Sequence, residues 1–180
     1  MIVNIKVEKS DFVLSHVMTD QDAQSLTQTE QREGVRAICI KDNKLLVIYE
    51  DTQEVYGTPG GGIEVNESHH QALTRELKEE VGATTLTIQS YLGYIKEQRI
   101  GKEKNVLFCP TQHYYLVDIE SFGDTALTDK ESAKKLKHTF LPLDTIIHKN
   151  NSHLTSDETY SYFYFFQNEL FKLLKQKLSL

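Results

Sequence analysis

The 180-residue chain contains no tryptophan, only two cysteines and three prolines, and no excess of basic residues. Two cysteines, Cys39 and Cys109, are too few for a disulfide scaffold, and their apolar surroundings favour buried free thiols. A formal net charge of -6 argues against a long nucleic acid as the main partner, because neutralising phosphates requires a basic surface. Nucleotides remain compatible with this charge, because bound metal ions can reverse the local field.

Long hydrophobic runs are also missing. No apolar stretch approaches the length of a membrane-spanning helix, and residues 1–8 lack the apolar stretch of a secretory signal. We therefore expect a cytoplasmic protein with no membrane partner. The hydrophobic and charged fractions, 39% and 26%, are typical of a globular domain, and the length is enough to bury a sizeable core.

Patterns along the chain predict one domain, residues 34–180, preceded by a polar N-terminal extension, residues 1–33, with some helix or loop. Periodicity and turn residues predict strands at 35–40 and 45–49, joined by a turn at Asp42-Asn43. They also predict one bent strand or two strands at 84–100, and a partner strand at 105–119 that is interrupted near Pro110. We expect loops at 56–62 and 120–139, a short helix or turn at 140–144, and a final helix at 156–178. The order of strands and helices predicts an α+β fold, an α/β/α sandwich with a mixed sheet between helices.

One further helix has clear end signals. Ser68 is a suitable N-cap, Gln71 three residues later completes a capping box, and Gly82 is a suitable C-terminal residue. The residues expected to face the core are Leu73, Leu77 and Val81.

This helix carries three carboxylates on one face, because Glu76, Glu79 and Glu80 are spaced at i, i+3 and i+4. Like charges this close repel one another unless a cation lies among them. Taken alone, such a cluster indicates a solvated acidic face. A glycine loop, Gly60–Gly62, lies upstream and allows the backbone to approach a phosphate closely.

The spacing to neighbouring residues favours the metal-site interpretation. A chance match to the full pattern at one starting point is on the order of one in 10⁸ or rarer. The matching residues are Gly61, Glu67, Arg75, Glu76, Leu77, Glu79, Glu80 and Gly82. This pattern is the Nudix box, and the chain resembles the Nudix hydrolase superfamily, including its MutT-like members. Two positions depart from it mildly: Ala83 stands where the family prefers a larger aliphatic residue, and Asn66 where many members carry glycine.

The resemblance implies a magnesium-dependent enzyme, with Mn²⁺ as a substitute metal. Glu76 and Glu80 would be the principal metal ligands, Glu79 would assist, and the Gly60 carbonyl would complete the set, since Mg²⁺ prefers oxygen ligands. Arg75 would orient the carboxylates through charge-assisted bonds, the alternative being a surface salt bridge. The glycine loop would contact the substrate.

Other roles stay open. Glu67 would lie near the positive end of the helix, where a simple capping role is the alternative. The general base is either a glutamate of the box or an acid from a later loop, with Glu131 and Glu120 as candidates that are otherwise solvated charges. We expect His69 and His70 to be surface residues, because hard magnesium prefers oxygen ligands.

The predicted reaction is hydrolysis of the pyrophosphate linkage of a nucleoside diphosphate derivative, with a nucleoside triphosphate slightly favoured. Family members that act on ADP-ribose usually carry a proline shortly after the box, and this chain has none between Gly82 and Pro110. The motif of NADH pyrophosphatases, which contains tryptophan, is absent. Alternatives are an ADP-ribose or nucleotide-sugar pyrophosphatase, a nucleotide-sensing module that has lost catalysis, and a non-hydrolytic isomerase. Retention of the box glutamates disfavours the sensing module, and neither cysteine lies in a motif that an isomerase would need.

The C-terminal aromatic run, residues 160–166, could stack nucleotide bases, but helical spacing favours packing. The residues that recur at that spacing are Phe163, Phe166, Leu170 and Leu174. The remaining aromatics would cover a second face, so we expect a homodimer.

Overall fold

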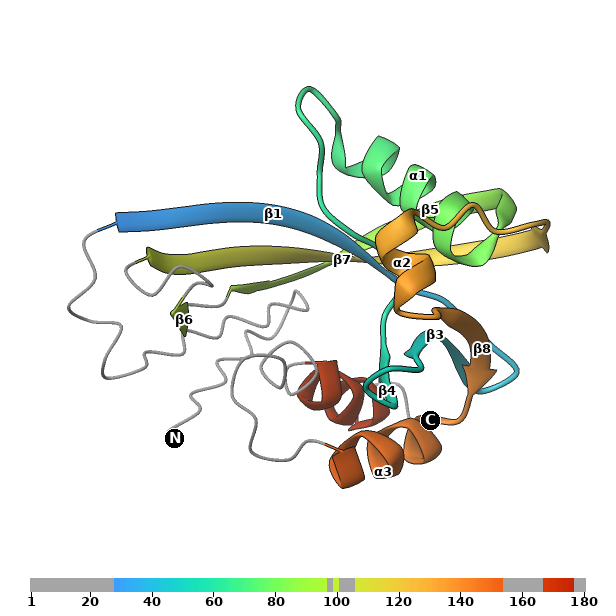
Figure 1. The fold of residues 1–180 in the computed structure, drawn as a ribbon. Helices are drawn as coiled ribbons and strands as arrows, with labels where there is room; N and C mark the ends of the chain where they lie inside the picture. The colour runs from blue at the N-terminus through green and yellow to red at the C-terminus, as the bar shows by residue number, and fades with distance from the viewer. Residues whose placement is uncertain (1–27, 97–98, 101–105, 154–166, 177–180) are drawn as a thin grey trace.

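The computed structural model describes residues 28–96, 99–100, 106–153 and 167–176 (Figure 1). The elements in chain order are β1 (Gln28–Ile38), β2 (Ile40–Lys41), β3 (Lys44–Glu50), β4 (Val55–Gly57), α1 (His69–Val81), β5 (Ala83–Lys96), β6 (Arg99–Ile100), β7 (Val106–Phe122), α2 (Asp129–Ala133), β8 (Lys137–Leu141) and α3 (Leu143–His153). Residues 167–176, here called the final helix, are also helical.

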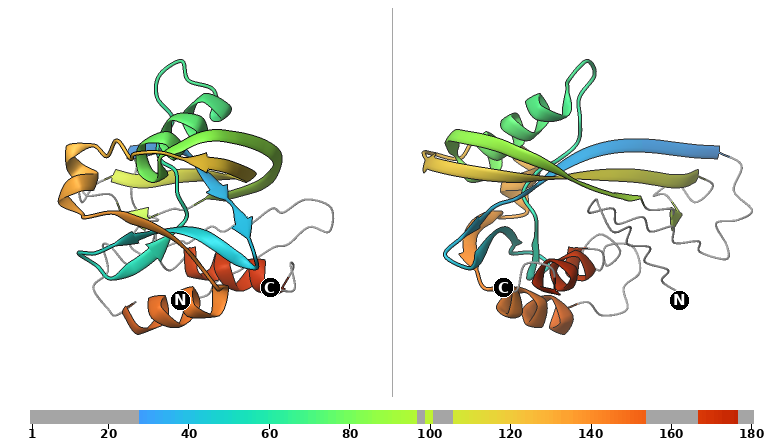
Figure 2. Two further views of the ribbon diagram at one scale, coloured as in Figure 1. Left: turned by 90° about the vertical axis from the view of Figure 1, so that its right-hand side faces the viewer. Right: turned by 180° about the vertical axis from the view of Figure 1, so that it is seen from behind.

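The strands form two sheets in the described part of the chain. In the first, β7 lies between β1, which runs parallel to it, and β5, which runs antiparallel, and β6 also pairs with β7. In the second, β3 pairs with β2, β4 and β8, all antiparallel. Helix α1 covers one side of the first sheet, and α3 and the final helix lie at the opposite end of the molecule, as the further views also show (Figure 2). The predicted α+β fold with a mixed sheet between helices is confirmed.

Each helical layer has its own core. The core beneath α1 joins the helix to β1, β3 and β7 through residues such as Leu73, Leu77, Val35 and Tyr115. The other core joins the strands to α3 and the final helix, with Tyr114 beside Leu170 and Phe171. Neighbouring residues of β7 therefore serve opposite cores, as side-chain alternation along a strand requires.

The first strand differs from the prediction. β1 begins at Gln28 and so crosses the predicted domain boundary at residue 33, and it pairs with β7 along its whole length. Only Ile40 and Lys41 pair with the start of β3 across the predicted turn, where Asp42 and Asn43 have φ angles of 50° and 58°. A parallel partner nearly eighty residues away leaves no local signal, which is why the pairing was not predictable.

Later boundaries also differ. β4 occupies the start of the predicted loop at 56–62, and the predicted loop at 120–139 contains the end of β7, all of α2 and the start of β8. The segment 140–144 ends β8 and begins α3. β7 continues through Pro110, which lies opposite Arg32 of β1. Pro110 has no partner residue in β5 or β6, because β6 pairs with β7 up to Phe108 and β5 pairs with it from Thr111.

The predicted final helix is described only from 167 to 176, and the aromatic run lies outside the described residues. Leu170 and Leu174 are fully buried, as the spacing predicts. No helix in the described ranges is both long and apolar enough to cross a membrane.

The final helix also holds the chain just before the glycine loop. The buried Gln167 accepts hydrogen bonds from the Thr58 backbone N–H (2.9 Å) and hydroxyl (2.7 Å), and it donates one to the Tyr114 hydroxyl (2.9 Å). In a similar way, Asn150 of α3 accepts from the N–H of Tyr56 and donates to its carbonyl. Two side chains from the C-terminal part thus satisfy the backbone that leads into Gly60.

We predict that Gln167→Ala lowers the free energy of unfolding by about 1–3 kcal/mol, because it leaves the Thr58 N–H buried without its acceptor. The matched control is Gln176→Ala, at an exposed position of the same helix, which should change stability by less than about 0.5 kcal/mol. Urea unfolding followed by far-UV circular dichroism measures both. Equal effects of the two substitutions would contradict the role given to Gln167.

Candidate metal-binding and catalytic site

Helix α1 forms as its end signals predict. The Ser68 hydroxyl accepts from the N–H of Gln71 at 3.3 Å, and the Gln71 side chain accepts in return from the N–H of Ser68 at 2.9 Å. Gly82 ends the helix in the left-handed conformation, with a φ of 70°. The side of α1 that faces the core carries Glu76 and Glu80 as well as the predicted apolar residues. Packing of the helix therefore buries two carboxylates.

Arg75 binds several groups of the box at once. Its Nε and Nη2 donate to the two carboxylate oxygens of Glu67, both at 2.9 Å, and its Nη1 lies 2.8 Å from Glu76 Oε1 and 3.5 Å from Glu79 Oε2. Nη2 also donates to the Gly62 carbonyl at 2.9 Å. The bond to Glu67 raises the pKa of Arg75, and the same bond lowers the pKa of Glu67. Glu67 thus fixes Arg75, and Arg75 orients Glu76 and links α1 to the glycine loop.

The two buried carboxylates differ in their partners. Burial raises the pKa of Glu76, and the neighbouring Arg75 opposes that rise. Burial also raises the pKa of Glu80, to about 8, although the Arg36 charge and a hydrogen bond from the Gly60 N–H oppose it. The negative charges of Glu76 and Glu131 raise the pKa of Glu80 further. Glu80 therefore resists ionisation in the metal-free protein.

The glycine loop lies alongside β1 and against the carboxylates. Hydrogen bonds of 2.9 Å join the N–H of Val35 to the carbonyl of Gly61 and the N–H of Ala37 to that of Pro59. The Gly60 N–H donates to Glu80 Oε2 at 2.7 Å, and the Gly60 carbonyl accepts from Arg36. A side chain at Gly61 would overlap the Glu76 carboxylate. The absence of a side chain is thus a requirement of close approach at this position.

A third carboxylate joins Glu76 and Glu80. One carboxylate oxygen from each of Glu76, Glu80 and Glu131 lies within 4.8 Å of the others. Glu131 belongs to α2, where its side chain accepts from the N–H (2.7 Å) and hydroxyl (2.8 Å) of Thr128. Glu120, the other candidate from the later segment, is exposed on β7 and is not part of this cluster. Such an oxygen-rich set suits a hard divalent cation such as Mg²⁺ or Mn²⁺.

Most of the residues singled out from the sequence therefore meet here: Gly60, Gly61, Gly62, Glu67, Arg75, Glu76, Glu79, Glu80 and Glu131. Glu79 is half-buried and lies at the edge, toward Arg75. The sequence did not identify Arg36 as a residue of the site. Its place between Val35 and Ala37 in a strand predicts only that its side chain faces away from the α1 core. Both cysteines are free thiols, Cys39 buried and Cys109 partly buried.

The two histidines of α1 behave differently from each other. His70 is exposed, as expected, whereas His69 is half-buried and its Nδ1 lies 2.8 Å from the Tyr115 hydroxyl. His69, His113 and Glu33 form a second cluster, which the sequence did not reveal.

Comparisons with known proteins identify the family. The family model described as "NUDIX domain" matches residues 30–163. An RNA pyrophosphohydrolase from a Nitratiruptor species is 28% identical over 127 residues, which cover 65% of this chain and 81% of that protein.

Solved structures share the fold. A NUDIX hydrolase from Nitrosomonas europaea superposes with a TM-score of 0.55 at 22% identity, covering 70% of this chain and 82% of that one. A UDP-X diphosphatase superposes with a TM-score of 0.54 at 17% identity, covering 82% of this chain and 64% of that one.

The burial of Glu80 predicts how stability depends on pH in metal-free protein. Its pKa is higher in the folded state than in the unfolded chain, so its contribution is full below about pH 4.5 and is lost as pH rises through about 8. Glu80→Gln keeps the shape and an acceptor for Gly60 but cannot ionise. Relative to the native chain, this variant should gain stability as pH rises from 5 to about 8.5, by at least roughly 1 kcal/mol.

The measurement is urea unfolding in excess chelator at several pH values. Glu120→Gln removes an exposed carboxylate and should shift stability by less than about 0.5 kcal/mol. A stability difference between Glu80→Gln and the native chain that stays constant with pH would contradict the burial argument.

Proposed function

This chain belongs to the Nudix family and is a hydrolase acting on pyrophosphate bonds; from this premise we propose that it cleaves nucleoside diphosphate derivatives with Mg²⁺. The observation that carries the proposal is the group formed by Glu76, Glu80 and Glu131 beside the glycine loop. These carboxylates are close, mostly buried and only partly neutralised by Arg75 and Arg36, so a divalent cation fits them in charge and in ligand type.

When bound, the cation would polarise a phosphate and lower the pKa of a water molecule. The protein's own groups prepare the site for it. Arg75 holds Glu76 in place, and the Gly60 N–H fixes one oxygen of Glu80. The Gly60 carbonyl, proposed as a further ligand, is held by Arg36, and Glu79 lies beside Arg75 as an assisting carboxylate. The backbone of Gly61 and Gly62 is proposed to contact the substrate phosphates.

The position of Glu131 favours it over Glu120 as the acid from outside the box that takes a proton from water. Its side chain is held by Thr128 at the start of α2, within reach of both buried carboxylates. Glu120 is exposed on the sheet.

A nucleoside triphosphate is the proposed substrate, with Mn²⁺ able to replace Mg²⁺. The likeness to a relative named RNA pyrophosphohydrolase supports a second candidate, the 5′-triphosphate end of an RNA. The net charge of -6 favours recognition of a chain end over binding along a nucleic acid. The cytoplasm and a homodimer remain our expectations for location and assembly.

We predict that the native chain turns over at least one substrate from a panel of nucleoside triphosphates, 5′-triphosphorylated RNA and ADP-ribose in Mg²⁺. Glu80→Gln should lower kcat by about 10²-fold or more while the fold is kept, because it removes a charged ligand of the site. Glu120→Gln is the control and should retain activity. Products are identified by mass spectrometry and folding by circular dichroism. Unchanged turnover in folded Glu80→Gln would refute the proposed site, and no turnover of any panel member would refute the proposed substrate class.

Gly61→Ala tests the close approach of loop and carboxylate. The new methyl group would displace the Glu76 carboxylate, so Mn²⁺ affinity should fall by about 10–100-fold, as when groups that orient ligands are lost. The matched control is Gly123→Ala, where the added carbon would meet only the Thr84 methyl at 3.1 Å and the Gly82 carbonyl oxygen at 3.9 Å. Electron paramagnetic resonance of free Mn²⁺ measures both affinities. Native affinity in folded Gly61→Ala would show that Glu76 does not bind the metal from this position.

A further inference from the structure

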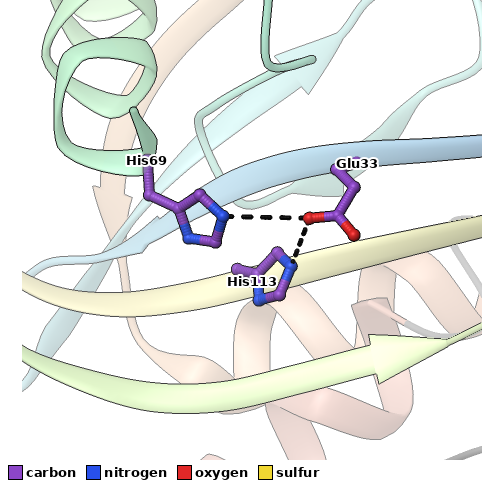
Figure 3. A group of neighbouring side chains, drawn as sticks. All are labelled: Glu33, His69 and His113. Carbon is purple, nitrogen blue, oxygen red and sulfur yellow. Dashed lines mark hydrogen bonds and ion pairs between the residues drawn. The ribbon is translucent and has the colours of Figure 1, made fainter. Parts of the chain in front are cut away.

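A second group of metal-binding side chains lies on the α1 side of the first sheet. Glu33 comes from β1, His113 from β7 and His69 from the first residue of α1, and the three side chains point toward one another (Figure 3). One ligand atom from each lies within 4.8 Å of the others. We propose that Glu33, His69 and His113 bind a divalent transition metal of the Zn²⁺ class, at a site separate from the glutamate cluster.

The distances are close to those of a coordinated ion. Glu33 Oε2 lies 3.0 Å from His113 Nε2 and 3.8 Å from His69 Nε2. Ligands of a tetrahedral zinc, each about 2.0–2.1 Å from the metal, are about 3.3 Å apart. The two distances to Glu33 thus lie within about 0.5 Å of this spacing. The same Glu33 oxygen faces both histidines, so the two imidazoles already converge on one point.

Each histidine is oriented from its far side by a tyrosine. His69 Nδ1 lies 2.8 Å from the Tyr115 hydroxyl, and His113 Nδ1 lies 2.9 Å from the Tyr91 hydroxyl. A metal on Nε2 requires the proton on Nδ1, and a hydroxyl can accept it. Without metal, the Tyr91 hydroxyl can donate to His113 Nδ1 while His113 Nε2–H donates to Glu33 Oε2 at 3.0 Å. The polar atoms of His113 therefore keep partners in both states.

The ligand types select the ion. Two imidazoles and one carboxylate suit Zn²⁺ and similar transition metals, whereas Mg²⁺ prefers oxygen ligands alone. Two neutral histidines and one carboxylate leave a net negative charge for the cation. The expectation that His69 is a surface residue rested on magnesium chemistry and does not extend to zinc.

The site remains open to solvent. The side chain of Glu33 is 56% exposed, that of His69 34% and that of His113 14%. Three protein ligands and solvent access leave the fourth position of a tetrahedral ion to water. The ion can also enter without unfolding of the domain.

A metal here would join three segments that are far apart in sequence. It would tie the start of α1 to β1 and β7 of the first sheet. β1 is itself bonded to the segment after the glycine loop, because the Glu33 carbonyl accepts from the Ile63 N–H at 3.1 Å. An ion that binds only the folded protein raises its stability by mass action. Zn²⁺ should therefore raise the Tm of chelator-stripped protein.

The test uses the full chain without a histidine tag, stripped of metal and titrated with Zn²⁺ alone. Imidazole ¹H–¹⁵N spectra should show His69 and His113 shifting with coordination through Nε2, while His70 stays unshifted. Calorimetry should show that His113→Asn and Glu33→Gln each lower Zn²⁺ affinity by at least about tenfold. Tyr91→Phe keeps the ring but removes the hydroxyl and should weaken binding by about 10–100-fold.

His70→Asn is the matched control, since His70 neighbours His69 and its ring contacts Tyr115 without belonging to the cluster. It should bind Zn²⁺ as the native chain does. Circular dichroism confirms that each variant is folded. Unshifted His69 and His113 signals in excess Zn²⁺ would overturn the proposal, as would equal Zn²⁺ affinity in the native chain and in folded His113→Asn. A Zn²⁺ effect removed by Glu80→Gln but retained by His113→Asn would place the ion in the glutamate cluster and would equally overturn it.

Discussion

Two carboxylates, Glu76 and Glu80, are buried on the side of α1 that also packs the core, and the rest of the site is arranged around their burial. Burying a charged group costs free energy unless partners replace its lost hydration. Arg75 supplies charge to Glu76, and the Gly60 N–H supplies a hydrogen bond to Glu80. Glu80 nevertheless keeps a pKa of about 8, so these partners compensate only in part. The remaining deficit favours a cation at the proposed site.

The compensation depends on backbone that the helix itself does not control. The glycine loop must lie against α1, and it is held there from three directions. Its carbonyls accept from β1, Arg75 binds the Gly62 carbonyl, and Gln167 of the final helix binds Thr58 just upstream. Because the final helix is about a hundred residues from the loop in sequence, the geometry of the proposed metal ligands depends on the whole fold being complete.

Local signals carried the sequence-based prediction of α1 and of the box. Ser68, Gln71 and Gly82 set the ends of the helix, apolar spacing set its buried side, and the spacing of the glutamates indicated the chemistry. The partners brought in from elsewhere were not predictable in this way. Arg36 reaches the site only because β1 lies beside the glycine loop, and the parallel pairing of β1 with β7 has no local signature. Glu131 was a candidate from the sequence, but α2 was not predicted, although Thr128 and Glu131 have the spacing of a capping box that could have identified this helix.

The same distinction explains why one of the two proposed metal-binding groups was visible in the sequence and the other was not. His69 precedes Glu76 by seven residues and Glu80 by eleven, close to two and three turns, so one side of α1 contributes to both groups. The glutamates of the box belong to one short stretch, and their spacing alone indicates a shared site. His69 acquires its meaning only when β1 brings Glu33 and β7 brings His113 beside it. Because one group offers only carboxylates and the other mainly imidazoles, different metals suit them, and a single helix can serve both without competition for one ion.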